Sequence, residues 1–512
     1  MLVKTYGSAV HGIDALTITI EVNISAGINF FLVGLPDSAV KESQQRIDSA
    51  LRQCKQKIPG KKIVINMAPA DIRKEGSAYD LPIAIGILAA DEQIPGTEVH
   101  KYMIMGELSL DGSLKPIKGV LPIAIRARED GFKGFILPKE NAREAAVVDK
   151  LEVFGVESIK QVIDFFKGKI ILEQTVIDTR KEFFNSLNSS ELDFSDVKGQ
   201  ENVKRAMEIA AAGGHNIIMV GPPGAGKTML AKRISGILPP LTLHEALETT
   251  KIHSVAGKIS KGTSLMVTRP FIPPHHTISD VALVGGGAYP QPGAISLAHN
   301  GVLFLDELPE FKRTVLEVMR QPLEDRQITI SRAKFTVEYP ASFMLVSSMN
   351  PCPCGYYNHP EKDCVCTTGM VQKYLNKISG PLLDRIDIHI EVVPVPFSKL
   401  SEMEASESSE SVRKRVIASR DIQLARFKET KEVYSNAQMS SRQIRTYCEI
   451  DAAGQALLKN AMEKLGLSAR AYDRILKVSR TIADLENSEA IQADHLAEAI
   501  QYRSLDRDNW GN

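Results

Sequence analysis

A glycine-rich segment follows a short apolar run near the middle of the chain. The segment has the spacing GxxxxGK[ST] of a phosphate-binding loop and consists of Gly221, Pro222, Pro223, Gly224, Ala225, Gly226, Lys227 and Thr228. The apolar residues NIIMV before it predict a strand, and MLAKRISGIL after it predicts a helix. Glycines let backbone N–H groups turn towards phosphate oxygens, Lys227 would neutralise the β- and γ-phosphates, and Thr228 would offer Mg²⁺ a hydroxyl ligand. The segment therefore predicts a site for ATP and Mg²⁺.

A second apolar run, GVLFL, ends in the acidic pair Asp306 and Glu307. Carboxylates that leave a buried strand stand where the sheet of a phosphate-loop enzyme presents Mg²⁺. Asp306 would hold the metal through its water shell, and Glu307 would polarise the attacking water. Together with the upstream loop, the pair predicts ATP hydrolysis.

The chain resembles the AAA+ ATPases, and within them the magnesium-chelatase-like branch that includes the bacterial YifB/ComM proteins. The resemblance covers nearly the whole chain and rests on stretches such as AAAGGHNIIMVGPPGAGKT, SSMNPCPCGYYNHP, SGPLLDRIDIHIEV and SARAYDRILKVSRTIADLE. It implies that Asn350 is the polar sensor that holds the attacking water and that Arg385 is an arginine finger for a neighbouring subunit. It also implies that Arg470 is the second sensor, a role for which Arg474 competes. An arginine finger can act only on a neighbouring subunit, so we expect a ring-shaped homo-oligomer, a hexamer.

The segment QITISRAKFTVEYP follows the acidic pair and has the alternation of a β-hairpin. The hairpin tip would carry Arg332 and Lys334. The segment resembles the hairpin that lines the pore of related hexameric helicases, where basic side chains grip the phosphate backbone of DNA. The alternative is an edge hairpin whose charged turn is merely solvated.

Four of the six cysteines lie close together as CxC-x9-CxC, with His359 between the pairs. These are Cys352, Cys354, Cys364 and Cys366. Clustered thiols in a reducing compartment favour a closed tetrahedral site for structural Zn²⁺. The alternative is a loop of unliganded cysteines after Asn350.

Several elements must position these residues, and the periodicity of the sequence predicts an α/β protein. We expect a Lon-protease-like α+β domain over 1–175, a linker over 176–196 and an AAA+ domain with a parallel sheet and helices on both faces over 197–397. A flexible connection over 398–411 and an all-helical lid over 412–512 complete the predicted organisation.

The first domain resembles the proteolytic domain of Lon through EGSAYDLPIAIGILAAD and GELSLDGSLKPIKGV. Active Lon enzymes use a Ser–Lys dyad. Here Asp80 and Leu121 align with the two dyad positions, and Ser77 and Lys118 are each offset by three residues. Peptidase activity is therefore disfavoured, and we expect this domain to bind DNA or to organise the ring.

The chain carries 62 basic and 62 acidic residues, so contact with nucleic acid must come from local patches. No apolar run reaches the ~18–20 residues that span a bilayer, and the N-terminus lacks the apolar stretch of a signal peptide. We therefore expect a cytoplasmic protein that does not enter membranes. The resemblance implies a DNA motor of the helicase or branch-migration type in recombination or natural transformation. A chelatase-type or protein-remodelling ATPase is the alternative.

Overall fold

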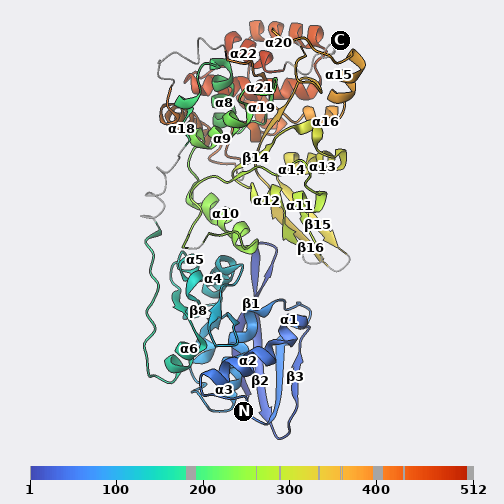
Figure 1. Ribbon diagram of the computed structural model, residues 1–512. Coiled ribbons are helices and arrows are strands. Elements are labelled where there is room, and N and C mark those ends of the chain that lie inside the picture. Colours follow the sequence, from blue (N-terminus) through green and yellow to red (C-terminus); the bar gives the residue numbers. More distant parts are fainter. Residues whose placement is uncertain are drawn as a thin grey trace.

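The computed structural model places three parts along one elongated molecule (Figure 1). It describes residues 2–179, 192–260, 262–287, 290–332, 335–357, 359, 361–395, 407–430 and 433–503. The first part lies at one end, the parallel sheet and its helices lie in the middle, and the helices α19–α22 lie at the other end (Figure 1). This arrangement confirms the predicted order of a mixed α/β domain, a central parallel sheet and a helical C-terminal region.

The N-terminal part is built on a mixed seven-stranded sheet of order β3-β4-β2-β1-β5-β8-β9. Its strands are β1 (Leu2–His11), β2 (Asp14–Ser25), β3 (Phe30–Val33), β4 (Lys62–Ala68), β5 (Tyr102–Ile104), β8 (Gly134–Pro138) and β9 (Glu152–Val156). A small ribbon consists of β6 (Glu107–Leu108) and β7 (Leu114–Lys115). The helices are α1 (Ser38–Lys41), α2 (Ser43–Gln53), α3 (Asp80–Ala90), α4 (Val120–Glu129), α5 (Ala142–Ala145) and α6 (Ile159–Phe166). Every residue of α3 is buried, so this helix forms the centre of the domain core.

The central sheet is parallel and has the strand order β11-β14-β17-β10-β18. Its strands are β10 (Ile217–Val220), β11 (Phe271–Ile272), β14 (Val302–Leu305), β17 (Met344–Met349) and β18 (Ile388–Glu391). β10, β14 and β17 are buried along their whole length, as expected of apolar strands covered on both faces. Because the strands are parallel, their carboxyl ends meet at one edge, where ligands bind in sheets of this type.

Helices and two ribbons surround this sheet. The helices are α8 (Glu201–Gly213), α9 (Lys227–Ile237), α10 (Leu243–Val255), α11 (Asp280–Val284), α12 (Ala294–Leu297), α13 (Arg313–Val318), α14 (Arg320–Asp325), α15 (Thr368–Leu375) and α16 (Gly380–Leu383). The ribbons pair β12 (Gly285–Gly286) with β13 (Gln291–Pro292), and β15 (Gln327–Arg332) with β16 (Phe335–Pro340).

Short 3-10 helices occur in all three parts of the molecule. They are η1 (Ser77–Tyr79), η2 (Val99–Lys101), η3 (Lys139–Asn141), η5 (Phe194–Asp196), η6 (Leu308–Glu310) and η7 (Asn436–Gln438).

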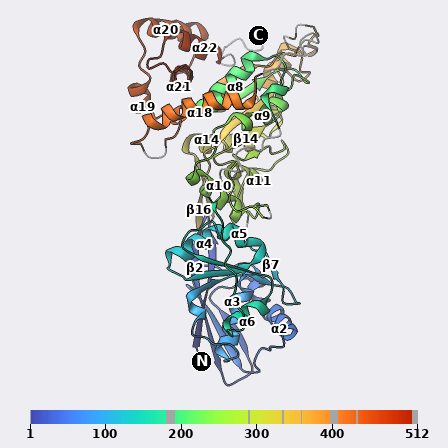
Figure 2. The same cartoon turned by 90° about the vertical axis from the view of Figure 1, so that its left-hand side faces the viewer.

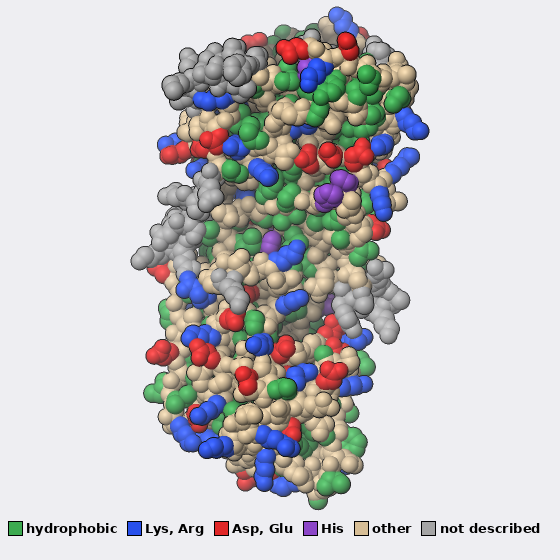
Figure 3. All heavy atoms as spheres, viewed as in Figure 1, with side chains coloured by type: hydrophobic (Ala, Val, Ile, Leu, Met, Phe, Trp, Pro, Cys, Tyr) green, Lys and Arg blue, Asp and Glu red, His purple; other side chains and the backbone are tan. Residues whose placement is uncertain are grey.

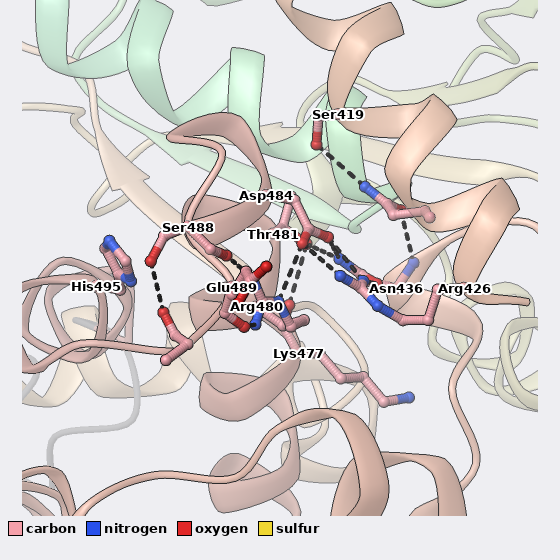
Figure 4. Close-up of polar contacts among 12 residues, drawn as sticks. Ser419, Arg426, Asn436, Lys477, Arg480, Thr481, Asp484, Ser488, Glu489 and His495 are labelled. Atoms are coloured by element: carbon pink, nitrogen blue, oxygen red, sulfur yellow. Dashed lines mark hydrogen bonds and ion pairs between the residues drawn. The ribbon is translucent and has the colours of Figure 1, made fainter.

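The C-terminal part consists of helices, and Figure 2 shows α19–α22 set to one side of the central domain, with α18 leading to them. The helices are α18 (Ser409–Arg426), α19 (Ser441–Tyr447), α20 (Ala452–Leu465), α21 (Ala469–Leu485) and α22 (Ala493–Gln501). A buried polar network fixes α21 (Figure 4). The Asp484 carboxylate accepts hydrogen bonds from Arg426 of α18, Asn436 of η7 and Arg480 of its own helix. The orientation of α21 is thus set by paired charges as well as by apolar packing.

Two predicted connecting segments are partly folded. Phe194 lies inside the expected linker, yet it is fully buried in the core shared by the central sheet and the C-terminal helices. Ser408 lies inside the expected flexible connection, yet its hydroxyl caps α18 by accepting from the N–H of Ser411. Residues 180–191 and 398–406 of these segments lie outside the described part of the chain.

The N-terminal and central parts share an apolar contact. α4 packs on α10, and the N–H of Gly119 donates to the Ser254 carbonyl at 3.0 Å. Leu241, Ala246 and other residues of the central part join the N-terminal core cluster. At the turn between β1 and β2, Gly12 lies against Val337 of β16. The N-terminal domain therefore contacts the β15–β16 hairpin as well as α10.

Candidate active site

The glycine-rich loop lies between the carboxyl end of β10 and the start of α9. A Cβ added to Gly221 would lie 2.2 Å from the Val392 carbonyl oxygen, so only glycine fits there. Gly224 and Gly226 have φ values of +81° and +86°, in the left-handed region that glycine adopts without strain. Gly226 directly precedes the first residue of α9. The loop thus wraps around the N-terminus of a helix, which is a favourable place for phosphate.

Lys227 lies across this loop. Its ammonium group donates to the carbonyls of Gly221 at 2.6 Å and Pro222 at 2.9 Å, and to the Asn350 amide oxygen at 3.1 Å. Burial lowers the pKa of Lys227, while the nearby carboxylates of Asp306 and Glu307 act in the opposite direction. These contacts hold the predicted phosphate ligand and the predicted sensor Asn350 side by side.

Asp306 connects the phosphate loop with two strands of the sheet. Its carboxylate leaves β14 and accepts from the Thr228 hydroxyl at 2.7 Å and from the Ser348 hydroxyl. Ser348 lies on β17, two residues before Asn350. The sequence analysis missed Ser348, although alternation along FMLVSSMN places it on the same side of the strand as Asn350. The Thr228 hydroxyl and the Asp306 carboxylate are therefore close enough to serve one Mg²⁺ ion.

Glu307 adopts the left-handed backbone conformation at φ +54°, and its side chain is 56% exposed. Its carboxylate lies 3.8 Å from the Nδ1 of His276, which belongs to the segment before α11. The sequence carries no signal for His276, because the contact joins residues far apart in the chain. The residues present therefore fit a nucleotide with Mg²⁺: a glycine cradle for phosphates, the Lys227 ammonium, a hydroxyl and a carboxylate for the metal, and an exposed carboxylate for water.

Arg385 lies apart from these groups and is buried. Its side chain is 6% exposed, forms an ion pair with Glu324 of α14 and donates to the Pro381 carbonyl at 2.5 Å. A finger must reach another subunit, so the Glu324 pair has to open before Arg385 can act in that role. No sequence motif marks Glu324 as the partner of Arg385.

Arg470 and Arg474 lie in the first two turns of α21, and they differ in exposure. Arg470 is 59% exposed and lies 3.5 Å from Asp384, whereas Arg474 lies 2.9 Å from the buried carboxylate of Asp387. Burial disfavours the charged form of Asp387, but Arg474 and His215 outweigh it and hold the pKa below its ordinary range.

The two lid arginines lie at the sheet edge opposite to the chain's own phosphate loop. The N–H of Asp387 donates to the Asn216 carbonyl, just before β10, whereas the loop follows the other end of that strand. The four residues of β10 separate the two edges by about 13 Å, at ~3.3 Å per residue. The expected second sensor is therefore placed away from the nucleotide site of its own chain.

The predicted hairpin is confirmed. β15 and β16 pair antiparallel, with Gln327 opposite Pro340 and Arg332 opposite Phe335. Ile328, Val337 and other apolar side chains on one face are buried against the central domain. Lys334 and the side chain of Arg332 lie outside the described residues, so their contact with DNA stays a prediction.

The four clustered cysteines converge on one point. The Cys352 sulfur lies 3.3 Å from that of Cys354 and 3.7 Å from that of Cys364, and the last two sulfurs are 3.5 Å apart. The Cys366 sulfur completes a set within 4.8 Å. Tetrahedral Zn²⁺ with Zn–S bonds of ~2.3 Å needs S···S distances of about 3.8 Å, so the cluster fits a structural metal. His359 instead accepts from the N–H groups of Glu361 and Lys362 and shapes the loop.

In the N-terminal domain, the residues at the two positions of the Ser–Lys dyad make structural contacts. Asp80 is buried and forms a two-bonded ion pair with Arg46, at 2.6 and 2.9 Å. Leu121 is buried beside α10, and its N–H lies 3.4 Å from the Ser254 hydroxyl. Ser77 donates to Glu107. These positions stabilise the domain and its contact with the central part.

Among the described residues, no helix combines the length and the apolar character needed to cross a membrane. On the face shown in Figure 3, basic and acidic side chains are intermixed.

Similarity to known proteins extends over nearly the whole chain. The family described as "Magnesium chelatase, subunit ChlI" matches residues 193–400, "Subunit ChlI of Mg-chelatase" matches 20–141 and the ChlI C-terminal family matches 406–503. Competence protein ComM of Haemophilus influenzae is 44% identical over 99% of this chain and 98% of its own length. YifB of Salmonella typhimurium is 45% identical over 97% of this chain and 96% of its own. Lon protease 2 of Bacillus subtilis is 32% identical over 159 residues, which cover 28% of this chain and 27% of that protein.

Proposed function

Because this chain belongs to the ComM/YifB family of magnesium-chelatase-like ATPases, we propose that it is a motor that couples ATP hydrolysis to movement along DNA. The observation that carries the ATP-hydrolysing part of the proposal is the convergence of Lys227, Asp306 and Asn350 at the carboxyl edge of the central sheet. The similarity to a competence protein supports DNA recombination or natural transformation as the setting.

The chemistry follows from the residues at that edge. The backbone of the glycine-rich loop and Lys227 bind the phosphates, and in doing so Lys227 exchanges its carbonyl partners for phosphate oxygens. Thr228 and Asp306 would hold Mg²⁺, which would supply positive charge against the charge of the transferred phosphoryl group. Glu307 accepts a hydrogen bond from the attacking water, and Asn350 orients that water.

The arginines at the opposite edge support a ring. Arg385, Arg470 and Arg474 lie near the amino-terminal edge of the sheet, away from the phosphate loop of their own chain. We assign them to the nucleotide of the next subunit, where an arginine that meets developing charge raises the rate by about 10³–10⁵-fold in related enzymes. Head-to-tail contacts of this kind close into rings, and a hexamer is the assembly that we propose.

The other parts of the molecule fit the same role. The β15–β16 hairpin would place Arg332 and Lys334 on the phosphate backbone of DNA in the ring pore. The four cysteines would hold Zn²⁺ beside Asn350. The N-terminal domain would be a Lon-like fold without peptidase chemistry, with Asp80 and Leu121 at the dyad positions, that binds DNA or organises the ring.

The test compares ATPase rates of the parent protein with and without forked, Holliday-junction and single-stranded DNA. A DNA motor hydrolyses ATP faster when its track is present, and protein without the phosphate-loop lysine (Lys227→Ala) is the control. If none of these DNAs changes the ATPase rate, the proposal fails. The alternative is then a chelatase-type or remodelling ATPase that acts on a partner protein.

A further inference from the structure

The cysteine loop lies directly on the phosphate loop. Gly355, between Cys354 and the rest of the loop, has a φ of +86°, and a Cβ added there would lie 2.5 Å from the Cδ of Pro223. The three atoms nearest to that added Cβ all belong to Pro223. The backbone of the cysteine loop is therefore in van der Waals contact with the middle of the phosphate loop.

A second contact joins the same two segments. The Lys227 ammonium donates to Asn350 at 3.1 Å, and Asn350 lies two residues before Cys352. Cys352 is fully buried, so the start of the cysteine loop is anchored in the protein. The phosphate loop is thus contacted at Pro223 and at Lys227 by residues on the two sides of the Cys352–Cys354 pair.

The shape of this loop depends on local contacts, such as those of His359, and on the cysteines. Its described residues from 351 to 366 form turns and bends without a helix or strand. The sulfurs of four cysteines nevertheless meet within 4.8 Å. Since a bound metal would join both ends of the loop, its presence would fix where Gly355 meets Pro223.

We propose that Zn²⁺ held by Cys352, Cys354, Cys364 and Cys366 controls nucleotide binding, because it sets the positions of Pro223 and Asn350 at the phosphate loop. The metal site would then control the affinity of the ATPase for nucleotide in addition to stabilising the loop. This inference rests on the ATP-binding half of the proposed function and is independent of DNA.

A substitution at the contact tests the inference without touching a ligand. Gly355→Ala should weaken binding of a fluorescent ATP analogue roughly tenfold, as expected when an extra methyl is forced into a packed contact. Gly131→Ala is the matched control, because Gly131 also has a positive φ, +77°, but nothing lies within 4 Å of its added Cβ. The two positions carry similar backbone strain, but only Gly355 lies against the phosphate loop. Equal ATP affinity of Gly355→Ala and Gly131→Ala overturns the proposal, whatever their metal content.

The reciprocal measurement follows zinc itself. Parent protein should contain about one zinc per chain, as a closed four-thiolate site requires. Coupling is mutual, so a non-hydrolysable ATP analogue should slow the transfer of zinc to a chromophoric chelator severalfold. The Lys227→Ala protein should show no such slowing, which separates the coupling from a direct effect of the nucleotide on the chelator. Absence of zinc, or an equal rate of release with and without nucleotide in the parent protein, contradicts the inference.

Discussion

At the scale of single residues, Asp306 is the group on which the nucleotide site depends. Its carboxylate accepts one hydrogen bond from a hydroxyl of the phosphate loop and one from a hydroxyl of β17. Asp306 therefore links the phosphate loop, β14 and β17. Lys227 has a comparable role, since it bonds to the loop and to Asn350. Their hydrogen bonds align the groups that bind phosphate with those that act on water.

Replacement of two residues in this site should separate binding from hydrolysis. Lys227→Ala removes the cation that faces the phosphates, so tight ATP binding should be lost. Glu307→Gln keeps the shape and removes the base, so binding should persist while turnover falls by about 10²–10⁴-fold. Fluorescent-nucleotide titration and phosphate release measure the two effects. Normal ATP hydrolysis by the Glu307→Gln protein would contradict the assignment of Glu307 as the residue that acts on the attacking water.

The nucleotide site was largely predictable from sequence, and the surroundings of the arginines were not. The loop from Gly221 to Thr228 is contiguous, and the carboxyl ends of parallel strands must meet, which brings Asp306 and Asn350 to it. Glu324, in contrast, is a surface-type residue of a short helix, and nothing local marks it as the partner of Arg385. The edge of the sheet on which Arg474 lies depends on how the lid packs, which periodicity does not specify.

At the scale of elements, the lid is joined to the central sheet by buried charge. Arg474 and His215 both bond to Asp387, and His215 also lies 2.8 Å from the Thr481 hydroxyl of α21. Asn436 then links Thr481 to Asp484 (Figure 4). This continuous path joins the amino-terminal edge of the sheet to the C-terminal end of α21.

Loss of one charge in this path should destabilise the protein. Asp387→Asn leaves Arg474 without its counter-ion and should cost about 3 kcal/mol, in the range for a broken buried pair. Asp384→Asn removes the partner of the exposed Arg470 and should cost less than about 1 kcal/mol. Urea denaturation at neutral pH compares the two variants, and equal midpoints would contradict the role of the buried pair.

The same pair predicts a dependence on pH. Folding lowers the pKa of Asp387, so its stabilising effect is complete above the unfolded value of ~3.9 and is lost as pH falls below it. Between about pH 5 and pH 3, parent protein should lose more stability than Asp387→Asn protein. Parallel losses in the two proteins would show that Asp387 does not contribute through its charge.

At the scale of the whole molecule, the proposed ring follows from the separation of the arginines and the phosphate loop on opposite sheet edges. A mixture of Arg385→Ala and Lys227→Ala proteins tests it. Each variant alone should be nearly inactive, but some mixed interfaces combine an intact loop with an intact finger, so ATPase activity should recover in part. Sedimentation with nucleotide and Mg²⁺ should show the assembly. A monomer with full ATPase activity would exclude both ring and finger.

Movement of DNA is the central claim, and junction migration measures it most directly. Parent protein and the Arg332→Ala/Lys334→Ala variant are compared at matched salt, with Lys459→Ala/Lys464→Ala, two exposed lysines on α20, as the control for lost charge. We expect the parent and control proteins to migrate junctions with ATP. The hairpin variant should keep basal hydrolysis but lose migration, and its DNA binding should depend less on salt, by roughly 0.7–0.9 in the log–log slope for each lost phosphate contact. Equal migration by all three would remove the hairpin from the mechanism, and no migration by the parent protein would contradict a DNA motor.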